Sequence, residues 1–254
     1  MGINIKTALL LIALTPAGAQ ALNTEWGYEY WDLSFFSPSR IWSLRLQERG
    51  KKGTGYIEYY RTSRFKRQDN TVHGGIVGKL GPLGWDLKAG FTPKAAVLYR
   101  QISEVIFYLP SPGYTLEPFV RGNYRRFTDA KVTTGEAGLR FSPLSGWDAS
   151  VRAGYIQTAL EGPATQNKDA GSQSYQLGYT WKEALRIFTF YGSWREFFDS
   201  GNPSNPGEYS IAERGGGLSW ALISAGKLKA THSQERRSNG ASIKKYSLAV
   251  ETSF

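Results

Sequence analysis

The amino-acid sequence predicts an all-β protein, an antiparallel transmembrane β-barrel of about 14 strands in a single domain. Three observations favour this fold class. Apolar and polar residues alternate with a period of two along most of the chain. The N-terminal residues have the form of an export signal. The last strand keeps its alternation up to the aromatic residue Phe254.

The N-terminal segment contains the three parts of a secretory signal. Lys6 supplies the positive charge, a short apolar stretch follows, and small residues up to Ala21 form the cleavage zone. The apolar stretch is much shorter than the about 18 residues that a membrane-spanning helix needs. We therefore expect a signal peptide over residues 1–21 and a barrel over residues 22–254, with a start near Gln20 as the alternative.

Residues 114–124 show the alternation most clearly. One face carries Tyr114, Leu116, Pro118, Val120 and Tyr124, and the other carries Thr115, Glu117, Phe119, Arg121 and Asn123. Turn signals between such segments predict strands near residues 24–34, 40–48, 54–64, 71–80, 84–92, 96–109, 114–126, 132–142, 147–158, 174–182, 186–198, 208–221, 226–236 and 242–254. The first of these and those near 96–109 and 226–236 alternate poorly, so a barrel of about 12 strands is the alternative.

Alternation alone does not separate a membrane barrel from a soluble periplasmic β-sandwich, but two further features favour the barrel. The polar face is charged and rich in glycine, whereas the apolar face ends in aromatic residues, and the chain has 15 Tyr and 8 Trp. Residues 81–84, 110–113 and 142–146 form compact turns, and the connections at 160–171 and 199–207 are longer and polar. Short periplasmic turns and longer outer loops are typical of outer-membrane barrels.

The last strand carries the sharpest local signal. Tyr246, Leu248, Val250, Thr252 and Phe254 form one of its faces. This pattern resembles the C-terminal sorting strand of bacterial outer-membrane proteins, which implies recognition by the barrel-assembly machinery during insertion. We therefore expect a protein of the bacterial outer membrane, in contact with its lipids and lipopolysaccharide.

The net charge favours some partners over others. It is +10 for the whole chain, and +9 without Lys6. A basic excess suits nucleic acid, lipopolysaccharide phosphates or an anionic solute, but an exported protein rarely meets nucleic acid. We expect lipopolysaccharide and an anionic or saccharide solute as partners, and no nucleic acid. Cysteine is absent, which excludes disulfides, thiolate metal sites and a thiol nucleophile.

Catalytic chemistry has few candidates in this chain. Hydrolases that modify lipids need a base beside a hydroxyl nucleophile, and the only histidines are His73 and His232. Outer-membrane lipid hydrolases place a serine two residues after the histidine, where this sequence has Gln234, and Ser233 points to the opposite face. We therefore expect no enzyme activity and no catalytic, metal or cofactor site. A lipid-modifying enzyme with His232 as its base is the alternative.

Charged residues on the inward face predict a polar lumen. The expected set is Glu58, Arg64, Asp86, Lys88, Glu117, Arg121, Arg125, Glu136, Arg140, Asp148, Arg152, Arg195, Lys245 and Glu251. The candidates for attracting an anionic or saccharide solute into a narrow pore are Arg121, Arg125, Arg140, Arg152 and Arg195. The apolar residues that alternate with Arg195, namely Phe188, Phe190 and Trp194, are expected to face lipid. The alternative is a ladder of cross-strand ion pairs that plugs the lumen.

Residues 124–132, Tyr-Arg-Arg-Phe-Thr-Asp-Ala-Lys-Val, resemble the YaiO family of outer-membrane β-barrels. The pattern is an aromatic–Arg pair that ends one strand, a tight acidic loop, and a strand that returns through Gly135, Gly138 and Leu139. Gly154-Tyr155 and Phe254 extend the likeness along the chain. The resemblance implies an outer-membrane barrel of poorly defined activity and carries over no catalytic residues. A looser resemblance to the barrel domains of exopolysaccharide export porins implies a role in saccharide export.

Overall fold

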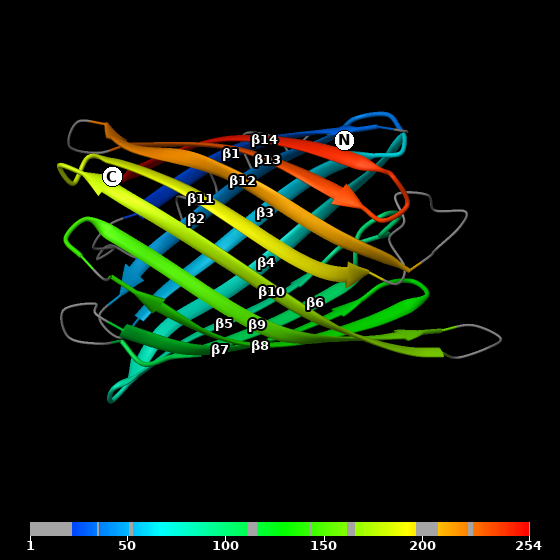
Figure 1. Ribbon diagram of the computed structural model, residues 1–254, viewed down its shortest axis with the longest axis horizontal. Coiled ribbons are helices and arrows are strands. Elements are labelled where there is room, and N and C mark those ends of the chain that lie inside the picture. Colours follow the sequence, from blue (N-terminus) through cyan, green and yellow to red (C-terminus); the bar gives the residue numbers. More distant parts are fainter. Residues whose placement is uncertain are drawn as a thin grey trace.

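The computed structural model describes residues 22–254 apart from residues 35, 51–52, 111–115, 143, 162–165, 197–207, 223–225 and 254. In this part of the chain, 14 antiparallel strands form one closed barrel (Figure 1). They are β1 (Leu22–Leu33), β2 (Ser39–Gly50), β3 (Gly53–Arg64), β4 (Arg67–Leu80), β5 (Leu83–Phe91), β6 (Gln101–Tyr108), β7 (Leu116–Arg126), β8 (Ala130–Phe141), β9 (Trp147–Leu160), β10 (Gln166–Trp181), β11 (Leu185–Glu196), β12 (Tyr209–Leu222), β13 (Gly226–Arg237) and β14 (Ser242–Ser253). Each strand pairs with its neighbours in the chain, and β1 pairs with β14 to complete the ring.

The closed ring confirms the predicted all-β barrel of 14 strands. The alternative of 12 strands is wrong, and so is the β-sandwich, which would need two separate sheets. No helix in the described residues is long and apolar enough to cross a membrane. The predicted signal peptide, residues 1–21, lies outside the described residues, and so does Phe254 of the predicted sorting strand.

The outward face of the barrel is apolar. Large hydrophobic side chains at alternate strand positions are exposed, among them Trp26, Trp42, Ile76, Val120, Tyr155, Leu177, Ile187, Trp220, Tyr246, Leu248 and Val250. The last three lie on β14 and belong to the predicted sorting strand. An apolar surface that encircles a protein is unfavourable in water, whereas the acyl chains of a bilayer accommodate it.

The two ends of the barrel differ in their connections. The residues predicted to form compact turns, 81–84, 110–113 and 142–146, fall between β4 and β5, β6 and β7, and β8 and β9. Residues 111–113 and 143 of these lie outside the described residues. The same end of the barrel holds the start of β1 and the end of β14. The two longest connections, residues 92–100 and 197–208, lie at the opposite end. We assign the end with the compact turns to the periplasm and the other end to the cell exterior.

Two strand boundaries differ from the prediction by five residues or more. β10 begins at Gln166, so residues 166–171, predicted to be loop, pair with residues 155–160 of β9. A strand segment outside the membrane does not contact lipid, so its side chains can be polar on both faces. The backbone hydrogen bonds between β9 and β10 therefore continue beyond the point where apolar and polar residues cease to alternate. β6 begins at Gln101, and residues 96–100, predicted to be strand, belong to a loop.

The structure reverses the predicted faces of β11. Arg186 of this strand bonds to Asp148 of β9, with 2.9 Å between Nε and Oδ1. Both side chains lie over Gly178 of the intervening strand β10, inside the barrel. The even-numbered residues of β11 therefore face the lumen, while Ile187 is 56% exposed on the outside.

Glycines of β12 explain why aromatic residues of β11 point inward. A Cβ atom added to Gly215 would come 2.8 Å from the ring of Phe190, and one added to Gly217 would come 2.8 Å from the ring of Phe188. The two rings thus occupy the space inside the barrel that side chains at positions 215 and 217 would otherwise fill. The prediction that Phe188, Phe190 and Trp194 face lipid is wrong.

A second aromatic–glycine contact, between Tyr56 of β3 and Gly75 of β4, provides a test of the packing. A Cβ at Gly75 would lie 2.1 Å from Cζ of Tyr56, whose hydroxyl donates to Asp86 at 3.1 Å. Gly75→Ala should displace this ring and cost about 1–3 kcal/mol of stability. The measurement is the temperature at which the folded barrel converts to the unfolded form on gels. Gly74→Ala is the matched control, since a Cβ there meets nothing within 4 Å, and equal unfolding temperatures for the two variants would contradict the prediction.

Candidate functional site

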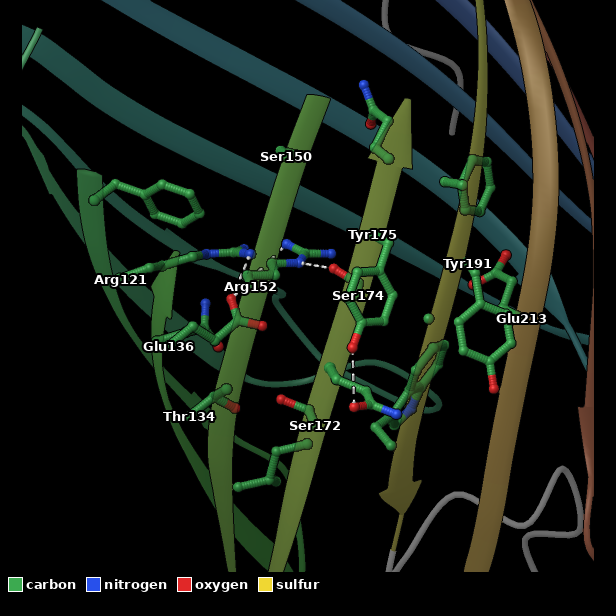
Figure 2. Close-up of a pocket in the computed structure, with 18 of the residues that line it drawn as sticks. Arg121, Thr134, Glu136, Ser150, Arg152, Ser172, Ser174, Tyr175, Tyr191 and Glu213 are labelled. Atoms are coloured by element: carbon green, nitrogen blue, oxygen red, sulfur yellow. Dashed lines mark hydrogen bonds and ion pairs between the residues drawn. The ribbon is translucent and has the colours of Figure 1, made fainter. Parts of the chain in front are cut away.

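A cavity of about 700 Å³ lies in the lumen, bordered by residues of β6 to β12 (Figure 2). All five predicted arginines, Arg121, Arg125, Arg140, Arg152 and Arg195, border it. Hydroxyl and amide groups lie among them, including Thr134, Ser150, Thr158, Ser174 and Gln176. The cavity therefore combines cationic groups with neutral hydrogen-bonding groups.

Arg121 is at the centre of a charge network on one wall. Its guanidinium donates to Glu104 through Nε at 2.9 Å and through Nη2, and its Nη1 donates to Glu136 at 3.2 Å. Lys88 of β5 also binds Glu104, with 3.0 Å between Nζ and Oε1. The carboxylate of Glu104 is almost fully buried, so its two cations compensate a charge that water does not reach.

Two further arginines extend the charged wall along β8 and β9. Arg140 binds Glu117 at 2.6 Å near the periplasmic end. Arg152 donates to Ser174 of β10 and lies 3.9 Å from Glu136. Figure 2 shows Arg121 and Arg152 converging above Glu136. The arginines are therefore held in place by acids and hydroxyls while part of each guanidinium remains open to the cavity.

Arg125 is near the exterior end of β7. Its Nε donates to Asn123 Oδ1 at 2.9 Å. In contrast with the other arginines of the wall, Arg125 forms no ion pair with an acidic residue in the part of the chain that the structure describes. Its positive charge therefore lies near the exterior end of the lumen without an acidic partner among these residues.

Arg195 differs from the other four arginines. It alternates with Trp194 and pairs in register with Ser210, so its side chain is on the outward face of β11. There it binds Glu208 at 3.3 Å, and both side chains are about half exposed. Arg195 therefore borders the cavity from an outward position of β11, whereas the other four arginines border it from inward positions of their strands.

The sequence did not reveal an aromatic wall in the cavity. It consists of Phe188, Phe190 and Trp194 of β11. Phe119 of β7 lies instead on the side of the arginines, with its ring 4.8 Å from the guanidinium carbon of Arg140. The centroids of the Phe188 and Phe190 rings are 6.5 Å apart. Gly215 and Gly217 of β12 are the sequence feature that could have predicted this wall, because glycines at alternate positions of a strand leave room for large inward side chains on the neighbouring strand. The cavity can thus contact a solute with charged groups on one side and apolar rings on the other.

The other half of the lumen, beside β3 and β4, is narrowed by the connection between β5 and β6. The carboxylate of Asp69 accepts hydrogen bonds from the backbone N–H groups of Ala96, Val97 and Leu98, at 2.9, 2.8 and 2.7 Å. Asp69 is inward and only 1% exposed. Residues 92–100 therefore fold into the lumen, and we call them the inner loop.

His73 provides a second attachment for the inner loop. Its Nε2 lies 2.8 Å from the hydroxyl of Tyr99, and its Nδ1 lies 3.1 Å from Glu58. Glu58 in turn binds Arg45 at 3.3 Å. These groups fill the lumen beside β2 to β5, which leaves the cavity on the side of β6 to β12.

A third network fills the lumen beside β12 to β14. Lys245 binds Glu235 at 2.8 Å and Glu213 at 3.1 Å, and Arg237 binds Glu235 at 2.7 Å. The alternative of a ladder of ion pairs therefore describes these parts of the lumen. The cavity lined by Arg121, Arg125, Arg140 and Arg152 lies beside the ladder.

The second histidine is outside the lumen. His232 stacks on Tyr246 with 4.7 Å between ring centroids, and its Nδ1 lies 3.2 Å from the backbone oxygen of Lys245. Ser233 points inward and donates to Glu213 at 2.6 Å. The base and the hydroxyl that a hydrolase would need are thus on opposite faces of β13.

A closed antiparallel barrel with an apolar outside and a charged lumen defines an outer-membrane β-barrel, and this protein is located in the bacterial outer membrane. No protein-family model and no curated protein matches the sequence. The fold is similar to the CymD monoaromatic hydrocarbon channel, with a TM-score of 0.59 and 9% identity over 93% of this chain and 88% of that chain. A bacterial polysaccharide outer membrane secretin is similar with a TM-score of 0.59 and 7% identity over 94% and 99%. A loop L8 deletion mutant of OmpT from Vibrio cholerae is similar with a TM-score of 0.57 and 8% identity over 93% and 99%.

Proposed function

We propose that the barrel is a narrow diffusion channel for small organic anions and acidic saccharides. The observation that carries this proposal is the lumen cavity in which four arginines lie beside an aromatic wall. Guanidinium groups bind carboxylates and phosphates, and aromatic rings offer an apolar surface to a sugar ring or another flat group. Two proteins of similar fold are described as a hydrocarbon channel and a polysaccharide secretin, which supports passage of an organic solute.

The charge balance of the cavity wall supports a preference for anions. The cations Lys88, Arg121, Arg125, Arg140 and Arg152 bind three carboxylates or lie beside them, namely Glu104, Glu117 and Glu136. A fourth carboxylate at the cavity, Glu213, is bound by Lys245. The excess of positive over negative charge is modest, but the low-dielectric wall of a lumen concentrates the electric field of these charges inside it. Local enrichment of an anion by about tenfold is within the range of such focusing.

Single-channel recording in a planar bilayer tests the proposal. The protein should conduct with a preference for chloride over potassium, and Arg125→Gln should weaken that preference because it removes a lumen cation that has no acidic partner in the described residues. Arg61→Gln is the matched control, since Arg61 is an exposed cation on the outward face of β3 that does not border the cavity, so its loss should leave the selectivity unchanged. Absence of conductance would mean that the networks plug the lumen, and cation selectivity would contradict the proposed solute class.

We also infer that the chain is related to the YaiO family and that the barrel-assembly machinery inserts it through its last strand. The second inference is supported by Tyr246, Leu248 and Val250 on the outward face of β14, the strand that closes the ring on β1. A transport role is preferred to an enzymatic one because His232 and Ser233 are on opposite faces.

A further inference from the structure

Three cations gather on the outward surface of β12 to β14. Arg214 of β12 and Lys244 of β14 both pair in register with Gln234 of β13, and Arg236 follows two residues later on β13. All three cations are exposed. We call Arg214, Arg236 and Lys244 the outer cation cluster.

The inward neighbours of these residues establish the direction of the cluster. Glu213, Glu235 and Lys245 precede or follow its members in the chain and are joined inside the barrel, with 2.8 Å between Lys245 and Glu235. Since successive residues of a strand point to opposite faces, the outer cation cluster points away from the lumen.

Acidic residues do not compensate the outer cation cluster. In the described part of the chain, no acidic side chain forms an ion pair with any of its three members. Asp32 of β1 lies opposite Lys244 in register but is not paired with it. Elsewhere on the outside, Lys131 binds Glu161 at 2.5 Å and Arg195 binds Glu208 at 3.3 Å. The cluster is therefore a concentration of three positive charges without an ion pair in the described residues, and Asp32 is the acid in register with one of them.

The position of the cluster along the barrel indicates what lies beside it. On the same face, one row closer to the periplasm, His232 stacks on Tyr246. Below that pair the face carries Leu218, Trp220 and Leu248, all exposed. Aromatic side chains mark the membrane interface in barrels of this kind. The outer cation cluster is therefore just above the apolar band, at the level of the head groups of the outer leaflet.

We propose that the outer cation cluster binds the phosphate groups of lipid A, the membrane anchor of lipopolysaccharide. Neighbouring strands are about 4.8 Å apart, so Arg214 and Lys244 are separated by about 10 Å across Gln234. Long side chains can converge over that distance on one phosphate, which a guanidinium binds through two parallel hydrogen bonds. Charge complementarity selects this lipid, because it carries phosphate at the depth where the cluster lies. The site is independent of any passage through the lumen.

Binding of purified bisphosphorylated lipid A to the full-length protein in detergent tests the proposal. The variant combines Arg214→Gln, Arg236→Gln and Lys244→Gln. The control removes the same number of outward cations from other strands at the same end, through Arg61→Gln, Arg126→Gln and Lys131→Gln. Folding of each protein is checked by its heat-modifiable migration on gels, and lipid A stripped of its phosphates is titrated in parallel.

Loss of the cluster should weaken binding of bisphosphorylated lipid A by at least tenfold, since each surface cation contributes roughly fivefold. The control variant should bind within about twofold of the unmodified protein, and dephosphorylated lipid A should bind all three proteins equally weakly. Inorganic phosphate at the same concentration should not compete. Unchanged affinity of the cluster variant, an equal loss in the control, or full competition by inorganic phosphate would overturn the proposal. Should the triple variant fail to fold, Arg236→Gln alone is expected to lower the affinity roughly fivefold, and no change would count against the site.

Discussion

Asp69→Ala should open the channel and increase its single-channel conductance. The substitution removes three hydrogen bonds from backbone N–H groups of the inner loop to a buried carboxylate. Bonds of this charge-assisted type contribute about 1.5 kcal/mol or more each. A loss of about 4 kcal/mol changes the ratio of attached to detached inner loop by roughly 1,000-fold. The loop should then leave the lumen more often, with the contact between His73 and Tyr99 as a remaining attachment.

Asp32→Ala is the control for this experiment, because Asp32 is an exposed acid on the outward face at the same end of the barrel. It removes the same charge and should leave the conductance unchanged. An Asp69→Ala channel with the conductance of the unmodified protein would show that the inner loop does not limit the passage. The ion-pair network on β12 to β14 would then be the constriction that limits the conductance.

Glu104→Gln should destabilise the barrel and make the channel more selective for anions. Glu104 is the shared partner of Lys88 and Arg121, and its carboxylate is almost fully buried. Removing one partner of a buried ion pair leaves an uncompensated charge and costs about 3–5 kcal/mol. The unfolding temperature on gels measures the first effect, and the reversal potential in a salt gradient measures the second.

Glu117→Gln separates the two effects of this substitution. Its partner Arg140 is half exposed, so water can solvate the freed charge and the loss of stability should stay below about 1 kcal/mol. Both variants add one net positive charge to the lumen and should shift the selectivity in the same direction. Equal unfolding temperatures for the two variants would mean that the network around Glu104 does not support the barrel.

The contents of the lumen support the selectivity that we propose for this barrel. Charged groups that bind each other occupy the parts beside β2 to β5 and β12 to β14, and the inner loop adds to the first of these. The remaining cavity keeps arginines whose positions are set by neighbouring acids and hydroxyls. Such groups are positioned before a solute arrives, which lowers the cost of binding it.

The alternation of residues was sufficient to predict the strands, their number and most of their faces. A period of two places Arg121, Arg125, Arg140 and Arg152 opposite the apolar residues of their strands, and the structure shows all four beside one cavity. The lipid solvates only apolar side chains, so the sequence pattern indicates the outward face of most strands.

Only the tertiary structure decided the features that depend on neighbouring strands. The rings of Phe188 and Phe190 fit inside because Gly217 and Gly215 of β12 leave space for them. Hydropathy within β11 contains no information about that space, so it predicted the wrong face for these rings. The inner loop is a similar case, because Asp69 meets its backbone N–H groups across 27 residues or more of chain. A buried carboxylate binds whichever donors the closed barrel brings to it, and that pairing exists only once the ring of strands is complete.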